Sequence, residues 1–108
     1  MAVAVPITVP SAGTITVRTR DGEPLLRLVG EIDLETVAAY RRVQPPVDVA
    51  AVDLTEVRFL SSSAVSFLLR QTQSVRDRGE LPVLVGVSAQ ARRVLELIGV
   101  MKLFALAA

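Results

Sequence analysis

Two short apolar runs, each followed by a segment with helical spacing, limit the possible folds of this chain more than any other feature. Residues 47–54 have the sequence VDVAAVDL, and residues 81–87 have the sequence LPVLVGV. Runs of this length without strict alternation are typical of strands that are covered on both faces. Such strands occur in parallel sheets whose crossovers are helices, so the sequence predicts an α/β fold.

Three segments have the periodicity of helices. The first, residues 34–43, is stopped by the prolines that follow it. The second follows a loop that contains Phe59 and Leu60, and its apolar positions recur at helical spacing until the segment ends near Gly79. The third begins after Ser88, a residue type that caps helices, and ends at Gly99. We therefore expect three helices, each following a strand.

The beginning of the chain adds a hairpin. Apolar and polar residues alternate on both sides of Asp21-Gly22, a dipeptide suited to a tight turn between antiparallel strands. Together with the two apolar runs, this predicts a single domain over residues 14–108 with a mixed, mostly parallel sheet of about four to five strands and helices packed on it. Residues 1–13 are expected to form a flexible lead-in or an edge strand. The apolar tail after residue 99 is expected to form a final turn or an edge strand.

The composition excludes most catalytic chemistry. The 108 residues include no cysteine and no histidine, which removes thiolate nucleophiles, the commonest general base and the commonest transition-metal ligand. The net charge is +1 without any block of like charges, so a nucleic-acid partner is not expected. No apolar run approaches the roughly 18 residues that a membrane span requires. We expect a cytoplasmic binding protein that is not an enzyme and has no cofactor or metal.

Two stretches resemble the STAS family, the domain shared by sulfate transporters and anti-sigma factor antagonists. Residues 28–33 (LVGEID) resemble the family's Gly-Glu-hydrophobic-Asp motif. Residues 52–55 (VDLT) and 59–65 (FLSSSAV) resemble its hydrophobic-Asp-Leu-Ser motif and the Phe-hydrophobic-Asp-Ser-Ser/Thr-Gly-Leu motif that follows. The order and spacing of these motifs extend the resemblance from about residue 14 to residue 106.

The resemblance implies a function in bacterial transcription regulation under stress. An antagonist of this type binds an anti-sigma factor and thereby releases a sigma factor. Ser62 matches the serine that is phosphorylated by a partner anti-sigma factor with a histidine-kinase-like ATPase domain, and Ser61 and Ser63 are alternative acceptors. The position of the serines supports this role independently of the resemblance. A serine triplet directly before a helix lies where backbone N–H groups and the helix dipole favour phosphate. The expected partner-binding residues are Asp33, Ser61, Ser63, Ala64 and Val65.

Two departures from the family pattern keep an alternative open. Ser61 stands where antagonists usually have Asp, and Ala64 stands where they usually have Gly. The alternative is a STAS scaffold that is not phosphorylated, or a regulatory subunit of a transporter complex. A small-ligand or nucleotide sensor is a third interpretation, although no Gly-rich phosphate loop is present.

Two aspartates follow apolar strand residues and could in principle form a catalytic pair. With no histidine and no third acidic residue at ligand spacing, Asp33 and Asp53 favour structural roles instead. We expect Asp33 to cap the first helix and to border the partner surface. Asp53 is expected to support the site by accepting hydrogen bonds from loop amides beside the serine triplet.

Overall fold

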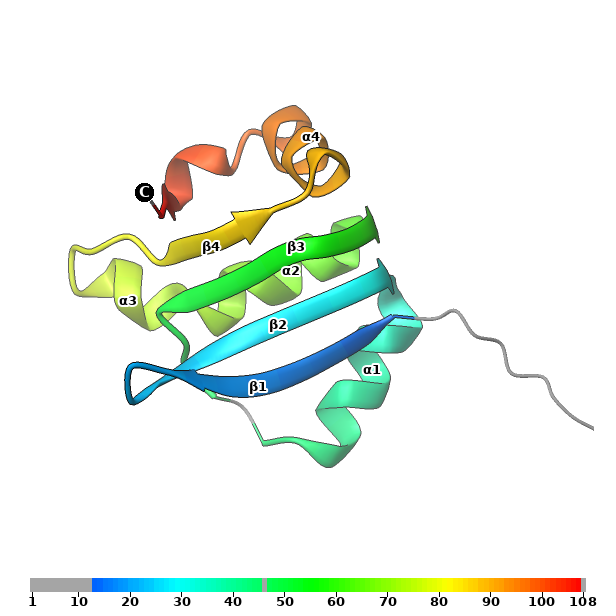
Figure 1. Cartoon of the computed structure of the whole chain (residues 1–108), viewed down its shortest axis with the longest axis horizontal. Coiled ribbons are helices and arrows are strands. Elements are labelled where there is room, and N and C mark those ends of the chain that lie inside the picture. The colour runs from blue at the N-terminus through cyan, green and yellow to red at the C-terminus, as the bar shows by residue number, and fades with distance from the viewer. Residues whose placement is uncertain (1–12, 46, 108) are drawn as a thin grey trace, which may run out of the picture.

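The strands form one mixed sheet in the order β1-β2-β3-β4-β5 (Figure 1). The computed structural model describes residues 13–45 and 47–107. Strands β1 and β2 are antiparallel, and each later neighbour is parallel to the one before, which confirms the predicted mostly parallel sheet. The strand bounds are Thr14–Arg20, Glu23–Ile32, Ala51–Leu60, Val83–Val87 and Ala105–Leu106. The lead-in predicted for residues 1–13 lies outside the described residues except for Gly13.

The predicted hairpin turn joins β1 to β2. Asp21 and Gly22 both have positive φ, 53° and 81°. A two-residue turn of this kind matches the right-handed twist of the strands it connects. Positions with φ > 0 suit glycine and aspartate, so the dipeptide explains the turn.

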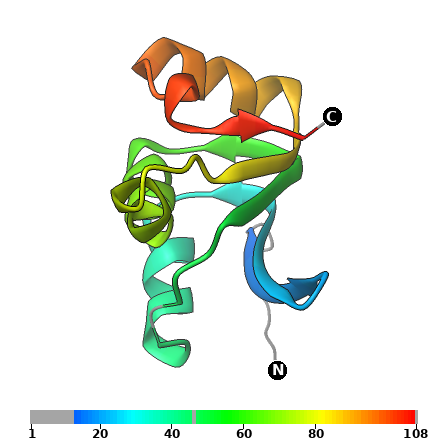
Figure 2. The same ribbon diagram turned by 90° about the vertical axis from the view of Figure 1, so that its left-hand side faces the viewer.

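The described part of the chain contains four α-helices, which pack against one face and one end of the sheet (Figure 2). Helices α1 (Leu34–Val43), α2 (Ser62–Gln71) and α3 (Gln73–Asp77) lie on one face, as Figure 2 shows. Helix α4 (Ala89–Ile98) lies at the end of the sheet where β4 stops. None of the helices in the described part of the chain is long and apolar enough to cross a membrane.

The core lies between the sheet and the helices on its covered face. It is aliphatic apart from a few aromatic rings, as expected for a chain with so few aromatic residues. Tyr40 of α1 and Phe67 of α2 meet edge to face, with ring centroids 5.5 Å apart. The fully buried strand residues include Leu26, Leu28, Ile32, Val52, Leu54 and Leu84.

Strand β3 differs from its prediction at both ends. It runs from Ala51 to Leu60, whereas the apolar pattern predicted residues 47–54 and placed Phe59 and Leu60 in a loop. Pairing with β2 continues to Ile32 opposite Leu60, but the register shifts twice along the way. Each shift changes which side chains face the core, so the apolar pattern stops at residue 54 while the strand continues.

The segment predicted to form one long helix ending near Gly79 consists of two helices, α2 and α3, because the helix is interrupted at Thr72. This threonine is fully buried, and its hydroxyl donates to the carbonyl oxygen of Leu68 at 2.7 Å. The same hydroxyl oxygen accepts a hydrogen bond from Arg76 at 2.8 Å. A hydroxyl that bonds back to the carbonyl four residues earlier is known to bend helices. The apolar period continues through the break, since Val75 is buried, and for this reason the sequence predicted a single helix.

The end of the chain contains both structures that the sequence left open. A 3₁₀ helix over Met101–Leu103 is followed by the two-residue strand β5. Gly99 ends α4 in the left-handed conformation with φ 88°, which confirms the predicted stop.

Ser88 joins α4 to the sheet. Its Oγ accepts from the amide of Ala91 at 3.1 Å, as a helix cap does, and donates to the carbonyl oxygen of Val57 on β3 at 2.6 Å. Its own amide donates to the carbonyl oxygen of Leu54 at 3.0 Å. One side chain therefore caps the helix and satisfies a strand carbonyl that β4 no longer reaches.

We expect Ser88→Ala to lower the free energy of unfolding by about 1 to 3 kcal/mol, because it removes the cap and leaves the Val57 carbonyl without its donor. Urea unfolding followed by circular dichroism measures the change. Ser66→Ala is the matched control, since Ser66 is an exposed helical serine with no side-chain hydrogen bond to a described residue. Equal stability of the Ser88 and Ser66 variants would contradict the double role of Ser88.

Candidate functional site

Two motifs that are distant in sequence meet where β2 and β3 end. Ile32 and Leu60 are paired at the last position of the two strands, and the amide of Ser61 donates to the carbonyl oxygen of Ile32 at 2.9 Å. Asp33 follows β2 directly and Ser61 follows β3 directly. The carboxyl end of the sheet therefore places the Asp33 motif and the serine triplet side by side, with α1 and α2 both starting there.

Ser61 begins α2 as its N-cap. The Oγ of this half-buried serine accepts from the amide of Ala64 at 3.1 Å, and its carbonyl oxygen accepts from the amide of Val65 at 3.0 Å. Serine and aspartate are both favoured at N-caps. The departure from the family's Asp therefore preserves the start of the helix and removes a negative charge beside Ser62.

Ser62 has the only exposed side chain of the triplet. It is the first residue of α2, and its hydroxyl makes no hydrogen bond to another residue in the described ranges. Ser63 is half-buried, and the Ser61 hydroxyl is occupied as the cap. The first amides of a helix have no partner within the helix, and they favour anions. Of the three hydroxyls, that of Ser62 is the best placed to receive a phosphate.

Ala64 and Val65 lie beneath the site. Their side chains are 0% and 3% exposed and belong to the core, so neither side chain is exposed to support the predicted partner-binding role. Both residues lie on the inner side of the amphipathic α2. Ala64 has helical backbone dihedrals, and Asp21 is the only described non-glycine residue with positive φ. The exchange of the family's Gly for Ala is therefore free of backbone strain.

Asp33 caps α1, as predicted. Its Oδ1 accepts from both the amide and the hydroxyl of Thr36, each at 2.9 Å. The hydrogen bond from the Thr36 amide, followed by that from the Thr36 hydroxyl, lowers the pKa of Asp33 below its ordinary value of 3.8. The side chain is half-buried beside the exposed end of the helix. Asp33 thus fixes the start of α1 at the edge of the sheet that also carries Ser62.

Asp53 lies in a strand, as predicted, but it accepts its hydrogen bond from a strand amide and not from the loop amides expected beside the serine triplet. Asp53 lies within β3 opposite Arg27, and its Oδ1 accepts from the amide of Thr55 at 2.9 Å. Its other oxygen is 3.9 Å from Nε of Arg27, which also pairs with Glu56 at 2.8 Å. Because β3 continues to residue 60, the strand carries the serine triplet away from Asp53. The Asp53 carboxylate therefore makes its hydrogen bond at the first register shift of β3 and not in the loop beside the serine triplet.

Two exposed apolar side chains lie at the same edge of the sheet. The sequence did not assign them to the site. Leu34 is 63% exposed at the start of α1, and Phe59 is 50% exposed near the end of β3, where it pairs with Glu31. Large apolar side chains exposed next to polar groups mark interaction surfaces. Phe59 begins one of the family-like motifs and Leu34 directly follows another, and this position is the signal that points to the site. Helical periodicity does not distinguish Leu34 from the buried positions of residues 34–43, and the apolar pattern places Phe59 in a loop.

Within the described residues, the Ser62 hydroxyl makes no hydrogen bond to a general base. No histidine is present in the chain, and no cluster of possible metal ligands occurs within residues 13–45 and 47–107. A serine hydroxyl needs a base to become a good nucleophile.

Comparison with known proteins identifies the family. The family described as "Mlab, STAS domain" matches residues 15–106. The chain belongs to the STAS domain family. A crystal structure of an anti-sigma factor antagonist from Mycobacterium paratuberculosis is similar to this STAS domain, with a TM-score of 0.63 and 25% sequence identity over 93% of this chain and 89% of the other. The predicted STAS domain of the anti-sigma factor antagonist type is thereby confirmed. No curated protein matches the chain.

The cap formed by Asp33 predicts a pH dependence of stability. A carboxyl whose pKa is lowered on folding stabilises the fold above its unfolded pKa, and this contribution is lost as the pH falls through the folded pKa. Asn caps helices as well as Asp but does not titrate. We therefore expect the stability of the wild type relative to Asp33→Asn to be constant above about pH 5 and to decrease below the ordinary value of 3.8.

Urea unfolding of both proteins at a series of pH values measures this difference. The other carboxyl groups titrate alike in the two proteins, so the comparison isolates position 33. A difference that does not change between neutral and acidic pH would show that the Asp33 carboxylate makes no charge-dependent contribution.

Proposed function

We propose that this STAS domain is an anti-sigma factor antagonist whose binding to an anti-sigma factor releases a sigma factor, and that phosphorylation of Ser62 ends this binding. The observation that carries the proposal is the exposed Ser62 hydroxyl at the N-terminus of α2, at the same sheet edge as the exposed Leu34 and Phe59. The antagonist from Mycobacterium paratuberculosis, similar along almost the whole chain, supports the same function. In this proposal the domain acts by binding, in the cytoplasm, without a nucleic-acid partner.

The partner in this proposal is an anti-sigma factor with a histidine-kinase-like ATPase domain. Its ATP supplies the phosphoryl group, and one of its side chains takes the proton from Ser62. The Ser62 oxygen forms a bond to the γ-phosphorus as the bond to ADP breaks. This division of labour fits a chain without histidine, in which the acceptor hydroxyl has no base of its own.

The energetics favour a switch in binding over a change in folding. A phosphate at the N-terminus of a helix interacts with the dipole by only about 0.3 to 1 kcal/mol, so the fold keeps its stability. The same group carries about −1.5 to −2 charges at neutral pH. Burying this charge against a partner surface without a matching cation costs several kcal/mol, on the order of the penalty for any desolvated ion. Phosphorylation therefore dissociates the complex and leaves the domain folded.

Incubation with the partner kinase and ATP tests the acceptor. We expect the intact mass to increase by one phosphate for the wild type and for Ser66→Ala, and to stay unchanged for Ser62→Ala. Ser66 is the control because it is exposed on α2, one helical turn after Ser62. Labelling of Ser62→Ala to the same extent as the wild type would assign the phosphate to another residue, with Ser61 and Ser63 as the next to be substituted.

A second candidate function follows from Ser61, which removes the carboxylate that antagonists usually carry beside the acceptor. The domain would then be a scaffold that binds its partner constitutively, or a regulatory subunit of a transporter complex. Ser62→Asp separates the two functions. A phosphorylation switch predicts a loss of affinity of at least about tenfold in calorimetry with the anti-sigma factor, whereas a constitutive scaffold predicts unchanged affinity.

A further inference from the structure

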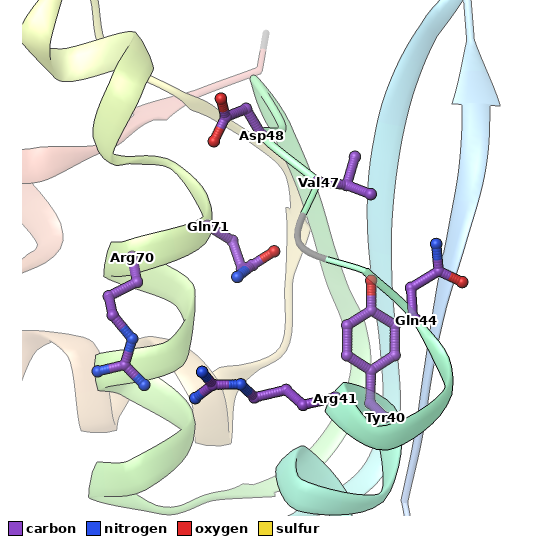
Figure 3. A pocket seen from close by; sticks show the side chains of 7 residues that line it. All are labelled: Tyr40, Arg41, Gln44, Val47, Asp48, Arg70 and Gln71. Carbon is purple, nitrogen blue, oxygen red and sulfur yellow. The ribbon is translucent and has the colours of Figure 1, made fainter.

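A cleft lies at the end of α2 opposite Ser62, about 14 Å along the helix. It has a volume of about 310 Å³ and opens between the last turns of α1 and α2 and the chain before β3 (Figure 3). This volume is at the lower end of the range of about 300 to 1,000 Å³ for small-molecule sites. The polar side chains that line it are Tyr40, Arg41, Gln44, Asp48, Arg70 and Gln71.

Two buried polar atoms of this cleft have no partner among the described residues. The hydroxyl of Tyr40 and the side-chain oxygen of Gln71 make no hydrogen bond to residues 13–45 or 47–107, and both atoms are buried. Tyr40 is only 8% exposed, and its ring is fixed by the edge-to-face contact with Phe67. Burial raises the pKa of Tyr40, so its hydroxyl keeps its proton and can donate. Buried polar groups are almost always paired in folded proteins, so each of these two atoms has the capacity for a further hydrogen bond.

Two guanidinium groups lie at the mouth of the cleft. Both Arg41 of α1 and Arg70 of α2 line the cleft. Figure 3 shows the Arg41 side chain reaching from α1 toward α2 and the Arg70 side chain lying along α2. Neither forms an ion pair with a residue in the described part of the chain, where the ion pairs involve Arg27 and Arg92. Both lie in the last turn of their helices, where carbonyl groups favour cations, but each guanidinium still has several free donors.

The charges around the cleft favour an anion. Asp48 is the only acidic side chain of the lining, so the two arginines and this aspartate leave a net charge of +1. Guanidinium groups bind carboxylates and phosphates through paired hydrogen bonds. Asp48 and the oxygen of Gln71 are acceptors, so they suit hydroxyl groups of a ligand and disfavour a second anionic group. The lining therefore matches a ligand with one oxyanion and at least one hydroxyl.

We propose that this cleft binds a small hydroxylated oxyanion, with its phosphate or carboxylate held between Arg41 and Arg70 and a hydroxyl reaching Tyr40 and Gln71. The site is independent of the proposed phosphorylation, because it lies at the other end of α2 and shares no residue with the serine triplet. The volume suits a polyol phosphate or a hydroxy acid better than a nucleotide.

Amide and arginine Nε signals in nitrogen-15 NMR spectra of the full chain test the proposal. The probes are glycerol 3-phosphate and glycerate, with glycerol and inorganic phosphate as partial ligands. We expect saturable shifts around Tyr40, Arg41 and Gln71 at millimolar concentrations of at least one of the two complete probes. A response to glycerol 3-phosphate alone identifies phosphate as the anion, and a response to glycerate alone identifies carboxylate.

Substitutions assign the contacts. Arg41→Gln and Arg70→Gln should each weaken binding by at least about tenfold. Arg93→Gln is the matched control and should leave affinity unchanged, because Arg93 is exposed on α4 and has no ion pair with a described residue. Tyr40→Phe keeps the ring against Phe67 and removes only the hydroxyl. It should weaken binding about threefold to tenfold while the thermal stability of the free protein stays the same or rises.

Three results would overturn the proposal. The first is the absence of saturable shifts with either complete probe, and the second is an equal loss of affinity in Arg93→Gln. The third is a Tyr40→Phe variant that loses stability but keeps the affinity of the wild type, because the hydroxyl would then serve the fold. None of these results bears on the phosphorylation of Ser62, which is measured with the partner kinase.

Discussion

The pairing of β2 with β3 is the interaction on which the rest of the structure depends. These parallel strands carry many of the fully buried aliphatic side chains, and their pairing extends to Ile32 opposite Leu60. Parallel strands require crossovers, and here the crossovers are helices that start from the same end of the sheet. A capping aspartate and a capping serine therefore come together across nearly thirty residues of sequence. The candidate site is a consequence of this register.

Side-chain caps begin three helices directly after the strands that precede them. Asp33, Ser61 and Ser88 each accept from the amide three residues later, and each directly follows a strand. The cap on α2 has a functional consequence as well. Because Ser61 uses its oxygen for the cap, the neighbouring Ser62 is left exposed and unbonded at the end of the helix with positive potential. A single local motif thus separates a serine that caps the helix from a serine whose hydroxyl is exposed.

The two ends of α2 have opposite character, and both proposals follow from this difference. Its N-terminus has free amides, the exposed Ser62 and exposed apolar neighbours, which suit a protein partner and a covalent phosphate. Its C-terminus meets the end of α1 in a cleft with two arginines and two buried oxygens that have no partner among the described residues, which suits a small ligand. Carbonyl groups at this end repel anions, so the arginines are necessary for any anion to bind there. The helix separates the two sites physically and chemically.

The sequence by itself determined the order of elements, the hairpin turn at Asp21-Gly22 and the stop at Gly99. It also determined the helix caps and the position of the serine triplet before a helix. Each of these features depends on a few neighbouring residues. Tertiary structure alone decided the length of β3, the break at Thr72 and the location of Asp53. Register shifts and a buried hydroxyl network arise from contacts between distant segments, and they leave no periodic signal in the chain. Tertiary structure also decided that Leu34 and Phe59 are exposed, that Ala64 and Val65 are buried, and that a cleft forms at Tyr40. Whether a side chain meets water or the core depends on which elements pack over it, and that is fixed only when the sheet and helices assemble.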